Sequence, residues 1–90
     1  TLEDLSLLLV QIREHFRAAN LAKDDGETIE TNLRTVEQES RKEKPRLPVI
    51  ESSLKSIESL VKSTESIGSF AAKLLPLVYQ AAEFARRLFL

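Results

Sequence analysis

Residues 50–70 constrain the fold most strongly, because they read as three successive seven-residue repeats. The first two repeats, residues 50–56 and 57–63, match at five of their seven positions. At 100° per residue the apolar side chains of this stretch fall on one side of a helix, and glutamates and lysines alternate along a second stripe. The repeat therefore predicts an amphipathic helix with a seam for other helices. The apolar positions are Ile50, Leu54, Ile57, Leu60, Val61 and Ile67.

Serines form a third stripe on the same predicted helix. Two interpretations are open for this stripe. It is an exposed polar face, or its small side chains allow another helix to approach closely. Its members are Ser52, Ser56, Ser59, Ser63 and Ser66.

The composition favours an all-α fold. Ninety residues make one domain, residues 1–90, and the chain has only two glycines, three prolines and no run of β-branched residues. We interpret it as a piece of a larger protein, because it has no initiator methionine. The absence of cysteine excludes disulfides and thiolate metal sites, and we expect a cytoplasmic location.

Two helices are predicted in the first half of the chain. The first spans about 2–23, with Thr1 as its N-cap and Asp4 completing a capping box. The second spans about 26–43, with Asp24 as its cap and Glu27 completing the box. Its apolar face is thin, so we expect its last two turns to project into solvent.

The second half of the chain predicts helices at about 49–66 and 69–89. Pro45 ends the preceding helix, and Pro48 suits the first turn of the next. A break at Gly68 gives an up-down bundle of four helices. The alternative is three helices, the last running straight through Gly68, because the polar positions continue in phase. Pro76 either kinks the last helix or marks its true start.

The C-terminal helix is apolar around most of its circumference, which is typical of a helix that is buried on nearly every side. Three amphipathic helices cover such an arc only in part, so we expect some of its apolar surface to remain for a partner. The predicted contact set, which also includes core residues, is Phe70, Leu74, Leu77, Val78, Phe84, Leu88 and Phe89.

No residue pattern points to catalysis, a metal or a cofactor. His15 is the only histidine, and the acidic residues lie beside basic ones on predicted exposed faces. A net charge of −1 argues against nucleic-acid binding, and the basic residues of 41–46 are explained by the negative end of a helix dipole.

In general layout the chain is a short helical module that closes on a hydrophobic helix. It resembles the small helical adaptor or effector-associated domains of multidomain bacterial signalling and defence proteins, which implies self-association or partner recruitment. It is also similar in outline to membrane-attacking four-helix bundles of the HeLo and mixed-lineage-kinase-like type, although those usually begin with their membrane-active helix.

We therefore expect a non-catalytic module that binds a protein partner, either a second copy, forming a homo-oligomer, or another helical domain. The alternative is a membrane-active bundle that places its C-terminal helix at a bilayer surface, where Arg86 and Arg87 beside apolar residues would suit the interface.

Overall fold

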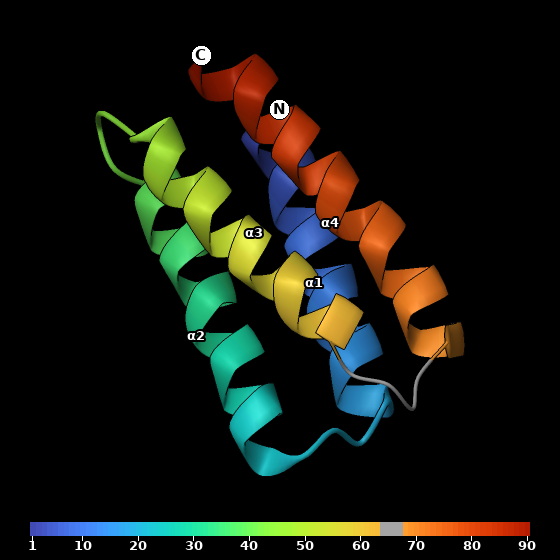
Figure 1. Ribbon diagram of the computed structural model, residues 1–90. Helices are drawn as coiled ribbons and strands as arrows, with labels where there is room; N and C mark the ends of the chain where they lie inside the picture. Colours follow the sequence, from blue (N-terminus) through green and yellow to red (C-terminus); the bar gives the residue numbers. More distant parts are fainter. Residues whose placement is uncertain (64–67) are drawn as a thin grey trace.

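The computed structural model describes residues 1–63 and 68–90. These residues form four α-helices and no strand: α1 (Leu2–Ala18), α2 (Lys23–Ser40), α3 (Leu47–Ser63) and α4 (Gly68–Phe89). Successive helices run in opposite directions, and both chain ends lie at the same end of the molecule (Figure 1). Each helix packs against two neighbours in the cyclic order α1, α2, α3, α4. The predicted all-α, up-down bundle of four helices is confirmed.

The alternative of one long C-terminal helix through Gly68 is wrong. α3 and α4 pack side by side, so the chain reverses direction between them (Figure 1). A single straight helix over 50–90 would measure roughly 60 Å at 1.5 Å per residue, whereas the whole molecule is 38 Å long. Gly68 is the first residue of α4, and the predicted helix end at 66 lies outside the described residues.

The start of α1 follows the predicted capping box. The Thr1 hydroxyl accepts a hydrogen bond from the Asp4 backbone N–H at 3.3 Å, and the Asp4 carboxylate accepts one from the Thr1 nitrogen at 2.9 Å. α1 ends at Ala18, earlier than predicted, and Asn20 then adopts a left-handed backbone with φ of 54°. Asparagine tolerates that conformation better than most residues, so it ends the helix without a glycine.

The predicted start of α2 is wrong by three residues. α2 begins at Lys23, so Asp24, Asp25 and Gly26 lie in its first turns instead of breaking the chain. Its N-cap is Ala22, which makes no side-chain capping bond, so Asp24 is not the cap. Asp24 and Asp25 are favourable there because the first turn of a helix carries partial positive charge.

The end of α2 also differs from prediction. α2 stops at Ser40, and its last turn does not project into solvent, because Glu39 and Ser40 are buried. The Ser40 hydroxyl donates to the Val36 carbonyl oxygen at 2.6 Å. α3 then begins at Leu47, two residues before the predicted start, with Pro48 in its first turn as predicted.

All four helices contribute to one apolar core, which fills the space between them. The apolar sides of α1, α2 and α3 point into this core, including the thin side of α2, and Ile67 of the predicted repeat lies outside the described residues. Its largest fully buried side chains are Leu5, Leu9, Ile12, Ile29, Leu33, Val36, Ile50, Leu54, Ile57, Val61, Leu74 and Val78. Burial of these side chains is the main term that stabilises the bundle.

Candidate interaction surface

Three of the seven predicted contact residues are core residues. Phe70, Leu74 and Val78 are each at most 6% exposed and pack inside the bundle. They follow one another at steps of four, which places them on the face of α4 that points inward. In the closed bundle they offer no surface to a partner.

The remaining four lie at the edges of α4. Leu77, Phe84 and Phe89 are partly buried and pack against the core, and Leu88 is 37% exposed. Leu77, Phe84 and Leu88 are separated by seven and four residues, so they lie along one side of the helix. That side faces α1, because Phe84 and Leu88 line a groove with Thr1 and Asp4. We call Leu77, Phe84 and Leu88 the α4 edge.

The groove at the α4 edge is small and has charged groups of both signs at its border. It has a volume of about 150 Å³ and is lined by Phe84, Leu88, Arg87, Thr1 and Asp4. The Thr1 amine and hydroxyl bind the Asp4 carboxylate and lower its pKa. Arg87 Nη2 lies 2.6 Å from Oε1 of Glu83 on the preceding turn. Exposed apolar carbon is thus bordered by an acid and a base.

Other exposed apolar side chains are spread over the surface. Leu7 and Val10, three residues apart, lie on the outer side of α1, and Leu7 is 60% exposed. Tyr79 borders a groove of about 230 Å³ between α3 and α4. The bundle covers more of α4 than its composition predicts, because Leu77, Phe84 and Phe89 turn partly inward.

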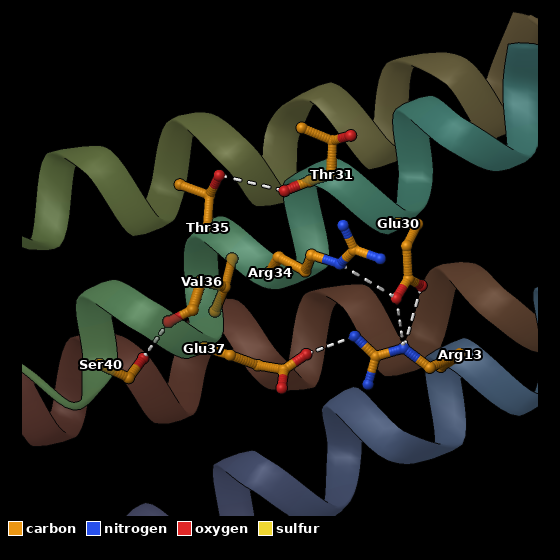
Figure 2. Close-up of polar contacts among 8 residues, drawn as sticks. All are labelled: Arg13, Glu30, Thr31, Arg34, Thr35, Val36, Glu37 and Ser40. Carbon is orange, nitrogen blue, oxygen red and sulfur yellow. Dashed lines mark hydrogen bonds and ion pairs between the residues drawn. The ribbon is translucent and has the colours of Figure 1, made fainter.

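An ion-pair cluster joining α1 to α2 was not predicted. Arg13 Nε lies 3.0 Å from Glu30 Oε2, and its Nη2 binds Glu37 Oε1 (Figure 2). Burial opposes the charge on Arg13, but Glu37 and Glu30 outweigh it and raise the pKa of Arg13. Arg34 also pairs with Glu30, one turn away on α2. Arg13 therefore lies partly buried between α1 and α2, held by two carboxylates of α2.

Glu39 forms a second cluster that sequence reasoning missed. Its carboxylate binds Lys42 Nζ at 3.0 Å, Arg46 Nε at 3.2 Å and the Arg46 backbone N–H at 3.0 Å. Arg46 contributes most, followed by Lys42, and together they lower the pKa of Glu39 to about 2. Two of the basic residues in 41–46 thus have a specific buried partner in addition to the helix dipole.

The serine stripe lies over an open groove between α2 and α3. Ser52, Ser56, Ser59 and Ser63 line it together with Thr28, and its volume is about 610 Å³. These four serines are exposed, while the neighbouring Ser53 is buried. The interpretation as an exposed polar face fits these positions, and Ser66 lies outside the described residues.

The remaining features considered are His15, metal-binding side chains and the basic pair Arg86 and Arg87. His15 is exposed, and no group of three or more metal-binding side chains occurs within residues 1–63 and 68–90. Arg86 pairs with Glu51 of α3 at 3.1 Å, so both basic residues predicted to suit a membrane interface are already bound to carboxylates. Among the described helices, none combines the length and the apolar character needed to cross a bilayer.

Comparison of the chain with protein-family models, with curated proteins and with solved structures gives no match.

Proposed function

We propose that this chain is a non-catalytic helical module that associates with a protein partner, in the first place a second copy of itself, through the α4 edge. The observation that carries the proposal is the exposure of Leu88 beside the partly buried Phe84. Apolar side chains at the edge of a packed core extend that core when a partner helix covers them.

The charges around the edge support a self-complementary contact. Asp4 and Arg87 both line the groove next to Phe84 and Leu88. In a two-fold symmetric pair the same patch meets itself, so a patch with an acid and a base has the charges that an acid-to-base contact in both directions requires. Both side chains are more than half exposed and have free hydrogen-bonding capacity.

The pairing of charges supports a non-catalytic role. General acid–base chemistry needs a titratable group in a cleft with a pKa near the working pH. Here Glu39 is held by Lys42 and Arg46, and its pKa of about 2 keeps it ionised at neutral pH. Glu30 and Glu37 are both bound by Arg13.

The test compares Leu88→Glu with the matched control Leu7→Glu, an exposed leucine outside the α4 edge. Chemical shifts of the backbone amides are followed while the protein is diluted over roughly a hundredfold range. We expect concentration-dependent shifts centred on the last turns of α4 and the first turn of α1. Leu88→Glu should remove them by burying a charge in the contact, and Leu7→Glu should leave them.

Two results would overturn the proposal. One is a set of shifts that centres on the outer side of α1 and is removed by Leu7→Glu alone. The other is the loss of concentration dependence in both variants to the same extent, which would mean that general surface hydrophobicity drives association.

A further inference from the structure

The four seams between neighbouring helices are not equally packed. The α1–α2 seam is the least extensive of the four, and the other three are much larger. The α1–α2 seam is also the one that Arg13 crosses, with carboxylates of α2 on both sides of its guanidinium (Figure 2). The thinnest seam is therefore held by ion pairs in addition to the apolar side chains that α1 and α2 contribute to the core.

Arg13 of α1 binds two carboxylates of α2, and we call Arg13, Glu30 and Glu37 together the latch. The Arg13 side chain is 18% exposed, and Glu30 and Glu37, which bind it, stand two turns apart on α2. Arg13 Nε contacts both oxygens of Glu30, at 3.0 and 3.2 Å. The ion pair across the α3–α4 seam, Arg86 with Glu51, is far more exposed and lies over a wide apolar interface.

When α1 and α2 separate, water solvates Arg13, Glu30 and Glu37, which offsets part of the cost of exposing apolar side chains at this seam. Separating α3 from α4 or α2 from α3 would part a more extensive interface, and the Arg86–Glu51 pair at the α3–α4 seam is already exposed to water. We propose that the bundle opens along the α1–α2 seam ahead of global unfolding, and that Arg13, held by Glu30 and Glu37, sets how readily it opens.

This opening goes beyond the proposed function, because it concerns the inside of the bundle. In the cyclic order of the helices, the α1–α2 seam lies opposite the α3–α4 seam. An open seam therefore gives access to the inner side of α4, including Leu74 and Val78. These are predicted contact residues that the closed bundle hides.

The test is native-state thiol labelling, which is clean because the chain has no cysteine. Single cysteines are introduced as Val36→Cys on α2 and Val78→Cys on α4, two core positions at most 1% exposed. Two probes keep the test valid if one substitution prevents folding. Each probe is combined with Glu37→Gln, which removes one arm of the latch, or with the control Glu83→Gln, which removes an exposed ion pair within α4.

We expect both cysteines to react through an opening that depends only weakly on denaturant and is more frequent than global unfolding. Glu37→Gln should accelerate labelling of both by about tenfold, since it leaves part of a buried charge unsatisfied. Glu83→Gln should leave the rate unchanged. Labelling that follows the rate and denaturant dependence of global unfolding in every variant would overturn the proposal, as would equal acceleration by the two glutamine substitutions.

Discussion

At the scale of single residues, Glu39 is a buried carboxylate whose ionised form the fold stabilises. Only 3% of its surface is exposed, yet Lys42 and Arg46 hold its carboxylate from the connection that follows α2. Its pKa falls from an ordinary 4.5 to about 2, so the folded state favours the ionised form. The group therefore adds stability above its ordinary pKa, and this stability is lost as the pH falls from about 4.5 through about 2.

This predicts a specific acid dependence. The free energy of unfolding, measured in urea between neutral pH and pH 2, should fall more steeply for the wild-type chain than for Glu39→Gln. At neutral pH the Glu39→Gln variant should be the less stable of the two. Glu43→Gln is the control, because Glu43 is exposed on the same connection and makes no ion pair among the described residues. Parallel curves for wild type and Glu39→Gln would contradict this account of the site.

Local contacts were predictable at this scale and distant ones were not. The capping box of Thr1 and Asp4 depends on residues three apart, and its pattern is visible in the sequence. The partners of Arg13 are 17 and 24 residues away, on another helix. Arg13 meets Glu30 and Glu37 only because of the way α1 packs against α2. The periodicity of the sequence does not specify that packing.

At the scale of elements, the helices were predictable and their ends less so. Apolar periodicity located the first three, because burial of one face is what makes each a stable helix, and a nearly continuous apolar composition located the fourth. Asp24 was predicted to cap a helix that begins at 26, but α2 already includes 24–26, because its first turn favours acids. Glu39 and Ser40 read as solvent-facing, and tertiary contacts bury both.

Proline inside α4 gives a prediction at the same scale. Pro76 lies in the middle of α4, where it cannot donate the hydrogen bond of a normal helical residue. Its side chain is exposed, so replacement by alanine leaves no cavity. Pro76→Ala should raise the free energy of unfolding in urea by about 1–3 kcal/mol.

Pro48→Ala is the matched control, because Pro48 lies in the first turn of α3, where a proline costs no helical hydrogen bond. It should give no gain in stability, and a small loss is expected from the freer unfolded chain. A gain equal to that of Pro76→Ala would contradict the assignment of strain to the interior of α4.

At the scale of the whole molecule, the apolar C-terminal helix decides what remains for a partner. The up-down bundle could be predicted, because amphipathic helices joined by short connections pack as antiparallel neighbours. The division of α4 between core and surface could not be predicted, because almost every side of that helix is apolar. Packing against α1 and α3 decides which residues of α4 are core and which are surface. It buries Phe70, Leu74 and Val78 and leaves Leu88 and part of Phe84 exposed at the edge.

The central claim is that this edge serves association, and sedimentation equilibrium of the wild-type chain tests it most directly. The measurement covers roughly a hundredfold range of protein concentration, enough to detect a weak dimer. The account predicts a mass that rises with concentration to a defined small multiple of the monomer. A single monomeric mass over the whole range would contradict self-association through the α4 edge.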